Sequence, residues 1–299
     1  MSKRKIRIAI KECLIVIVVV ATLSLLFGEK SPVTTAVEAY IKPTLNTENI
    51  NVHFIDVGQG SAVLIQQGKQ GILIDSGEDD YSEYLCDYIL SSGVEYFPYI
   101  IASHPHSDHI GGLDEVIGQF TVSEVVMPYI DESKEPDSEV YTDLLQAVDS
   151  SSAKSNYADV GEKLSAGDIN VEIIGPVKQS SNLNNMSVVC KVNAFSTTFV
   201  FMGDAEKSEI NQIYDTYSEF DCDVLHVPHH GSNTALHDDF FDSISAETAV
   251  ISCGKNNSYD HPHGEVLDFY ERIGCEIYRT DLEGDIIFTC DADGYDIRK

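Results

Sequence analysis

Three histidines and one aspartate fall within six residues near the end of the first third of the chain. They form the pattern His104-x-His106-x-Asp108-His109, which Ser103 separates from the apolar run Tyr99 to Ala102. Imidazole nitrogens and carboxylate oxygens are common ligands of zinc and similar cations. Because rigid scaffolds present such groups on loops at strand ends, the pattern predicts a metal site on a loop that follows a strand.

The second half of the chain places more ligand types behind apolar runs. These residues are Asp204, His229, His230, His261 and His263. Together with the first cluster they offer seven histidines on three loops, which favours a metal centre over ordinary packing. The remaining three histidines, His53, His226 and His237, are interpreted as structural.

The elements that must position these residues follow from the hydrophobic pattern. Apolar runs predict strands at 51–57, 61–66, 71–75, 99–102, 124–127, 169–174, 187–194, 197–202, 224–227, 248–252, 276–278 and 285–289. Helical periodicity predicts helices at 81–92, 113–120, 141–150, 206–217, 236–244 and 265–273, and the segment 161–168 is predicted as a turn. Strands that alternate with helices in two similar halves indicate a layered α/β fold with helices outside two sheets.

The first 30 residues form a separate segment. Five basic residues before position 12 precede an apolar run from Cys13 to Phe27, and this pattern is typical of a signal peptide or a short anchor. We expect a retained single-pass anchor at 1–30, a linker at 31–48 and one folded domain at 49–299 that contains the candidate metal ligands. The positive-inside rule then places the domain outside the cytoplasm, anchored to the cell membrane, or secreted if the segment is cleaved.

The net charge of the chain restricts the molecules that it can bind. The chain carries a formal net charge of −30, and beyond residue 30 it holds 13 basic and 47 acidic residues. Such an acidic surface repels polyanions and argues against unassisted nucleic-acid binding. The seven cysteines include no Cys-x-x-Cys pair, so a cysteine zinc site is not expected, and their pairing stays open.

Several motifs of the chain resemble those of a known family. The pattern from His104 to His109 resembles the signature of the metallo-β-lactamase superfamily, and the segments 73–77 and 201–204 resemble its first motif and its bridging aspartate. The segments 53–60, 182–189, 227–232 and 261–266 resemble the ComEC-type hydrolase domain of competence proteins more closely. The resemblance covers about residue 50 to 299.

This resemblance implies a four-layer αββα sandwich with two divalent metal ions, most often zinc, with manganese as an alternative. His104 and His106 would bind one ion, and Asp108 and His109 would bind the second. Asp204 would bridge both ions, and His261 would complete the second site, with His263 as its alternative. Asp75 would orient the ligands rather than bind metal.

One ligand that the superfamily usually provides is missing, because no histidine lies between His109 and His226. Asn184, Asn185 and Ser187 occupy roughly its place. Either the site holds a weaker or single metal, or His229 supplies the ligand, which we prefer. His230 would then point elsewhere and donate a proton to the leaving group, although the two roles could be exchanged.

A further turn could contribute to the site. Asp56 and Gln59 lie on a glycine-bounded turn, where they either line the site or serve turn chemistry alone.

The expected function is metal-dependent hydrolysis by a metal-bound hydroxide, since the chain has no Gly-x-Ser-x-Gly and no Walker loop. A phosphodiester substrate is favoured because two metal ions suit its charge-rich transition state. Nucleic acid, choline-phosphate and other surface phosphodiesters all remain candidates. The alternatives are a β-lactam or other ester hydrolase, and a non-catalytic metal-binding or assembly module.

Overall fold

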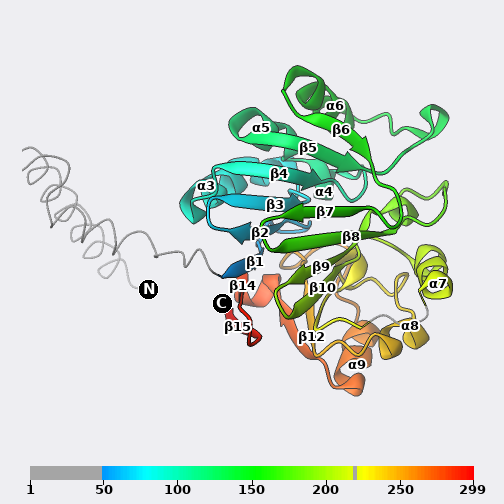
Figure 1. The fold of residues 1–299 in the computed structure, drawn as a ribbon. Coiled ribbons are helices and arrows are strands. Elements are labelled where there is room, and N and C mark those ends of the chain that lie inside the picture. Colours follow the sequence, from blue (N-terminus) through cyan, green and yellow to red (C-terminus); the bar gives the residue numbers. More distant parts are fainter. Residues whose placement is uncertain (1–48, 218–220) are drawn as a thin grey trace, which may run out of the picture. The chain divides into compact units, whose positions relative to one another are not determined.

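The computed structural model describes residues 49–217 and 221–299, and Figure 1 shows their arrangement. Two sheets contain the described strands. The eight-stranded sheet has the order β15-β14-β1-β2-β3-β4-β5-β6, and the seven-stranded sheet has the order β13-β12-β11-β10-β9-β8-β7. Strands β3 to β6 are parallel to one another, as are β10 to β13, and the other pairings are antiparallel.

The strands of the first sheet are β1 (Ile50–Phe54), β2 (Val63–Gln67), β3 (Gln70–Ile74), β4 (Tyr96–Ile101), β5 (Thr121–Met127), β6 (Lys154–Tyr157), β14 (Ile286–Cys290) and β15 (Tyr295–Arg298). Those of the second sheet are β7 (Lys163–Ala166), β8 (Ile169–Gly175), β9 (Val189–Ala194), β10 (Thr197–Phe201), β11 (Val224–His226), β12 (Thr248–Ile251) and β13 (Glu276–Arg279).

The α-helices are α3 (Ser82–Ser92), α4 (Ser107–Ile110), α5 (Leu113–Gln119), α6 (Glu139–Ser150), α7 (Lys207–Thr216), α8 (Asp238–Ser243), α9 (Gly264–Ile273) and α10 (Thr280–Glu283). Short 3₁₀ helices are η1 (Asp79–Tyr81), η2 (Glu132–Lys134), η3 (Asn184–Met186) and η4 (Pro228–Gly231).

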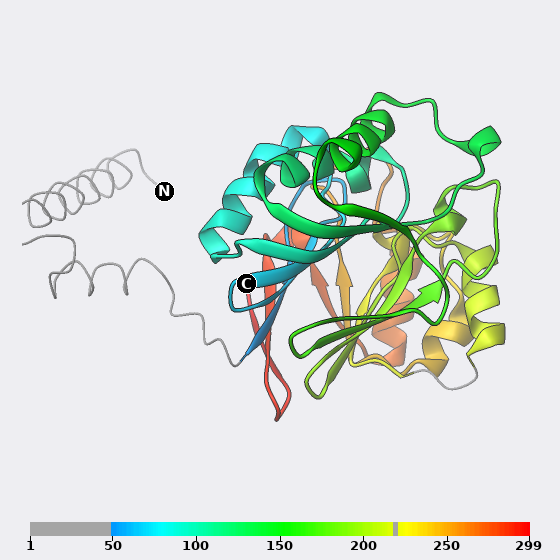
Figure 2. The ribbon, with the colours of Figure 1, turned by 45° about the horizontal axis from the view of Figure 1, so that its top comes forward.

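Three apolar cores define four layers. The central core lies between the sheets and includes Phe54, Phe199 and Phe288. A second core joins the first sheet to α3, α5 and α6, and a third joins the second sheet to α7, α8 and α9. Figure 2 shows these two sets of helices on opposite outer sides of the sheets. The expected arrangement of helices outside two sheets is therefore confirmed.

The principal differences from the predicted elements concern strands at sheet edges. The segment 161–168 was expected to be a turn, and this prediction is wrong because Lys163–Ala166 forms β7. Strands β6 and β15 were not predicted either. All three are edge strands, and β6 and β15 have no fully buried residue. Edge strands face water and carry polar side chains, so they lack the apolar run that marks an inner strand.

The predicted anchor at 1–30 and the linker at 31–48 lie outside the described residues. Within the described part of the chain, no helix combines the length and the apolar character needed to cross a bilayer. Six cysteines in this part are buried free thiols, namely Cys86, Cys190, Cys222, Cys253, Cys275 and Cys290.

Candidate metal centre

The site residues come from loops at the carboxyl ends of parallel strands. Asp75 follows β3, and the cluster from His104 to His109 follows β4 and continues into α4. In the second sheet, Asp204 follows β10 and the pair His229–His230 follows β11. Because both sheets direct these strand ends to the same edge of the core, residues distant in sequence meet there.

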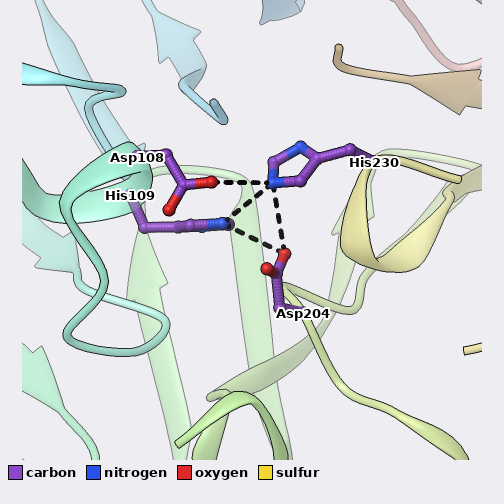
Figure 3. A group of neighbouring side chains, drawn as sticks. All are labelled: Asp108, His109, Asp204 and His230. Atoms are coloured by element: carbon purple, nitrogen blue, oxygen red, sulfur yellow. Dashed lines mark hydrogen bonds and ion pairs between the residues drawn. The ribbon is translucent and has the colours of Figure 1, made fainter. Parts of the chain in front are cut away.

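One group of ligand atoms joins the two sheets, and Figure 3 shows it. His230 Nε2 lies 3.2 Å from Asp108 Oδ2 and 3.5 Å from Asp204 Oδ1. His109 Nε2 lies 3.0 Å from Asp204 Oδ1 and 3.3 Å from His230 Nε2. The group therefore offers two imidazole nitrogens and two carboxylate oxygens to one point.

These spacings match a metal better than a hydrogen-bond network. With zinc–ligand bonds of about 2.0–2.1 Å, ligand atoms at tetrahedral angles stand roughly 3.3 Å apart. Asp204 Oδ1 is buried and accepts no hydrogen bond of suitable geometry, despite its 3.0 Å distance from His109 Nε2. A buried oxygen without a hydrogen bond is costly unless a cation satisfies it, so these four residues fit a divalent metal.

In His109 and His230, Nδ1 has a hydrogen-bond partner outside the group, which leaves Nε2 free to bind a metal. His109 Nδ1 lies 2.7 Å from Asp75 Oδ2, and His230 Nδ1 lies 2.9 Å from the carbonyl oxygen of Ser252. Both partners accept hydrogen bonds, so the proton belongs on Nδ1 in each neutral imidazole. The Nε2 lone pairs then point into the group, as metal-binding histidines require.

A second group shares Asp204 with the first. It contains His104, His106 and Asp204, with His104 Nε2 2.9 Å from His106 Nδ1 and 3.8 Å from Asp204 Oδ2. His229 Nε2 lies 3.6 Å from the same Oδ2 atom. The two oxygens of Asp204 thus face different groups, which is the geometry that a bridging carboxylate needs.

Electrostatics keep several of these groups in the form that binds metal. Burial lowers the pKa of His104 well below its ordinary value, and the neighbouring His109 lowers it further. Burial also lowers the pKa of His106. Both imidazoles are therefore neutral near pH 7, and a cation need not displace a proton from them.

Neighbouring charges, rather than burial, set the charge state of Asp204 and His109. Burial alone would raise the pKa of Asp204, but the charges of His109 and His230 hold it well below the ordinary value. Burial likewise opposes a charge on His109, yet Asp204, Asp75 and Asp108 raise the pKa of this histidine well above its usual range. The negative charges of these carboxylates therefore stabilise a cation that lies among them, and a metal ion supplies this positive charge more effectively than a proton.

The structure places His229 where we preferred it but distributes His230 and His261 differently from the sequence expectation. His230 lies within the group of Asp108 and His109, where we expected His261, while His229 approaches the group of His104. The His261 ring is stacked on His230 with centroids 6.2 Å apart, outside both groups, and its Nδ1 is buried without a hydrogen bond. His263 Nδ1 instead accepts a hydrogen bond from the backbone N–H of Asn233.

Asp75 lies where a positioning carboxylate would be needed. Its Oδ2 contacts His109 Nδ1 at 2.7 Å, and it accepts hydrogen bonds from the backbone N–H and the hydroxyl of Ser103. Ser103 Oγ also lies 3.1 Å from His104 Nδ1. Sequence reasoning missed Ser103, although its position directly before His104 was visible.

The loop with Asn185 and Ser187, which lies where the missing ligand was expected, forms hydrogen bonds with the backbone of Asp204 and of the start of α7. Ser187 Oγ accepts a hydrogen bond from the backbone N–H of Asp204, and Asn185 Oδ1 accepts two from the start of α7. Gly203 precedes Asp204 with φ +52°, and an added Cβ there would lie 2.9 Å from Ser187 Oγ. These contacts hold Asp204 close to the loop.

A cavity of about 480 Å³ opens over both groups. Gln59 and Asn184 line it, together with Glu78 and Tyr259, two residues that the sequence analysis did not single out. Asp56 does not line this cavity and accepts a hydrogen bond from the N–H of Gly58, as expected of turn chemistry. The volume is in the range of small-molecule sites.

Comparison with known proteins gives consistent results. A family model described as the metallo-beta-lactamase superfamily matches residues 55–255. The chain is 28% identical over 268 residues to ComE operon protein 3 of Bacillus subtilis (strain 168), which covers 83% of this chain and 34% of that protein. It is 26% identical to competence protein ComA of Neisseria gonorrhoeae over 238 residues, covering 78% of this chain and 31% of ComA. The chain spans about a third of the length of these relatives.

Solved structures share the fold. The metallo-beta-lactamase fold protein YhfI from Bacillus subtilis has a TM-score of 0.52 at 15% identity, covering 81% of this chain and 100% of YhfI. CmlA from Streptomyces venezuelae, described as a diiron beta-hydroxylase, has a TM-score of 0.55 at 13% identity, covering 91% of this chain and 59% of CmlA. Because one fold supports different reactions, the chemistry must be argued from the site.

Proposed function

Because the chain belongs to the metallo-β-lactamase superfamily, we propose that it is a hydrolase that cleaves a phosphodiester with the help of two divalent metal ions. The observation that carries this proposal is the sharing of Asp204 by two groups of ligands beneath one cavity. When bound, two such ions neutralise charge on a phosphoryl group and activate water as a nucleophile.

The residues around the ions would have separate tasks. Asp108, His109, Asp204 and His230 would hold one ion, and His104, His106 and Asp204 would hold the other, with His229 as the added ligand. Asp75 would keep the His109 ring in its binding orientation. The mixed nitrogen and oxygen ligands suit zinc best, and manganese is the alternative.

His261 is the chain's candidate for contact with the substrate. Burial and the nearby His230 lower the pKa of His261 to about 4, so its ring is neutral near pH 7. A neutral imidazole that lines the cavity donates a hydrogen bond to a substrate oxygen without adding charge. The proton-donor role that the sequence suggested for His230 does not pass to His261, because a ring that is neutral near pH 7 has no acidic proton to give to a leaving group.

Metal analysis and activity together test the proposal. The full-length purified chain should contain a stoichiometric transition metal and hydrolyse bis(p-nitrophenyl) phosphate. Asp204→Ala should lower both metal content and activity, the activity by at least about 100-fold. The control Asp296→Asn replaces an exposed carboxylate on β15 and should behave as the wild type.

Two outcomes would contradict the proposal in different ways. Protein without stoichiometric metal would refute the metallohydrolase itself. Protein that holds metal but leaves bis(p-nitrophenyl) phosphate, oligonucleotides and choline esters intact would favour a non-catalytic metal-binding module or a hydrolase of other esters, which a β-lactam assay would separate.

We also propose that the domain is held at the outer face of the cell membrane by residues 1–30. The support is the basic flank followed by the apolar run Cys13 to Phe27. Protease added to intact cells should digest the domain, and the intact chain should sediment with membranes. Mature protein that begins beyond residue 30 would instead indicate secretion after cleavage.

A further inference from the structure

Two carboxylates approach opposite nitrogens of the His229 ring. His229 Nε2 lies 3.6 Å from Asp204 Oδ2, and His229 Nδ1 lies 3.5 Å from Glu206 Oε1. Asp204 belongs to both ligand groups, whereas Glu206 belongs to neither. The side chains of His229 and Glu206 are only 19% and 20% exposed, so water screens the charge of Glu206 at the ring only in part.

The neighbours of the His229 ring determine which of its nitrogens carries the proton. Nδ1 lies 3.2 Å from Thr234 Oγ1, but a hydroxyl can donate to the ring or accept from it, so Thr234 favours neither tautomer. The carboxylate of Asp204 would draw the proton to Nε2, where it would prevent metal binding. Glu206 also accepts only, and it draws the proton to Nδ1, which leaves the Nε2 lone pair for a metal.

The loop between β8 and β9, residues 176–188, contains no histidine but holds Glu206 in place. Asn182 Nδ2 donates a hydrogen bond of 2.7 Å to Glu206 Oε2, and Asn185 Oδ1 accepts one from the backbone N–H of Glu206. The orientation of the Asn182 amide is fixed, because its Oδ1 accepts a hydrogen bond from the backbone N–H of Asn184. Glu206 Oε2 therefore binds the loop, and Oε1 remains for His229.

We propose that Glu206 is a positioning residue that keeps His229 in its metal-binding tautomer, and that Asn182 orients Glu206 for this task. The inference rests on the two-ion centre of the proposed function and adds two residues outside both ligand groups. Asp75 has a similar relation to His109 Nδ1 in the other group. The loop in which the missing ligand was expected thus contributes indirectly, because it holds the carboxylate that prepares His229.

Replacement of the Glu206 carboxylate by an amide tests the tautomer directly. In Glu206→Gln the amide oxygen would accept the hydrogen bond from Asn182 Nδ2, so the NH₂ group would face His229 Nδ1. An NH₂ group only donates, and it would therefore favour a ring proton on Nε2, which opposes metal binding. Glu206→Gln should weaken the binding of one of the two zinc ions by about 10- to 100-fold. Glu206→Ala imposes no tautomer and should weaken the same ion less.

A second substitution should restore the affinity that the first one removes. In the double variant Asn182→Asp/Glu206→Gln, the new carboxylate would accept a hydrogen bond from the amide NH₂, so the amide oxygen would turn to His229 Nδ1. Zinc affinity should then return close to that of the wild type. Titration of the metal-free, full-length chain with zinc against a fluorescent chelator measures both ions, and the visible spectrum of the cobalt-loaded chain reports the ligand geometry. Asp215→Asn, an exposed carboxylate on α7, serves as the control.

The order of the variants decides the inference. A purely structural role would make the isosteric Glu206→Gln milder than Glu206→Ala, whereas control of the tautomer predicts the reverse order and recovery in the double variant. If Glu206→Gln binds both ions as tightly as the wild type, or is milder than Glu206→Ala, the inference is overturned, and the hydrolase stands as long as bis(p-nitrophenyl) phosphate is cleaved. If the predicted order is found in a chain that cleaves no phosphodiester, the inference stands and the hydrolase proposal fails.

Discussion

His229 and His230 adopt left-handed backbone conformations one after the other, with φ of 52° and 54°. For residues other than glycine this conformation costs on the order of 1–3 kcal/mol each. This conformation directs His230 Nε2 to Asp108 and His229 Nε2 to Asp204 Oδ2. Two adjacent side chains thereby reach two different groups of ligands.

This division predicts separate effects of two substitutions on metal content. His230→Ala should remove the ion held by the group of Asp108 and His109, so that the purified chain retains about half the metal of the wild type. His229→Ala should leave both ions bound but weaken one of them in competition with a chelator. Equal metal content and affinity in both variants would refute the division, and His237→Ala, at the start of α8, serves as the control.

Asp75→Asn tests the positioning of His109. Asp75 has φ of 60°, a conformation that asparagine tolerates about as well, so the backbone should be preserved. The amide binds the His109 ring less strongly than the carboxylate does, and loss of such a contact typically lowers metal affinity 10- to 100-fold. Titration of zinc against a fluorescent chelator measures this change. Asp79→Asn, an exposed neighbour, should bind zinc as the wild type does.

Helix α7 contains a carboxylate with an unusual environment. Glu209 is fully buried, its Oε1 accepts a hydrogen bond from the N–H of Val177, and its Oε2 has no hydrogen bond. Burial raises its pKa to about 7. The folded state therefore holds a proton that the unfolded chain releases near pH 4.5, and the associated stability is lost as the pH rises through 7.

Glu209→Gln should remove this pH dependence. At pH 4.5 the variant and the wild type should unfold at similar urea concentrations, because the wild-type carboxyl is protonated. At pH 8 the variant should be more stable, by up to about 3 kcal/mol. The control Asp215→Asn changes an exposed carboxylate on the same helix and should show no such growing difference. A constant difference at both pH values would show that Glu209 has an ordinary pKa.

The elements differ in how well the sequence predicts them. Inner strands such as β4 and β10 are recognisable because both faces are buried and their residues form continuous apolar runs. The edge strands β6 and β15 lack this signal. The histidine and aspartate ligands could also be identified from the sequence. The superfamily resemblance is confirmed. The exchange of His261 for His230 in the group of Asp108 and His109 was not predictable, since the direction of the His230 ring depends on backbone angles within η4 that a sequence pattern does not encode.

At the scale of the whole molecule, the metal centre connects the two sheets. Asp108 and His109 follow a strand of the first sheet, whereas Asp204 and His230 follow strands of the second. A ligand that binds only the folded state stabilises it in proportion to the logarithm of its concentration over Kd. A metal at a thousandfold excess over Kd would contribute about 4 kcal/mol.

Removal of metal should therefore lower the melting temperature of the full-length protein by roughly 10 °C. Scanning calorimetry with and without a chelator measures the shift, and added zinc should reverse it. The chelator should not shift Asp204→Ala, which lacks the shared carboxylate. A chelator effect of equal size on that variant would place the stabilising ion elsewhere.

The pairing of β1 with β14 has a consequence for biosynthesis. β1 is the first described strand and lies inside the first sheet, between β2 and β14, but β14 is among the last elements of the chain. A ribosome releases nearly the whole domain before β14, the second partner of β1, emerges. The first sheet therefore completes only after translation has almost ended, and the nascent chain stays open to chaperones or a translocation channel until then.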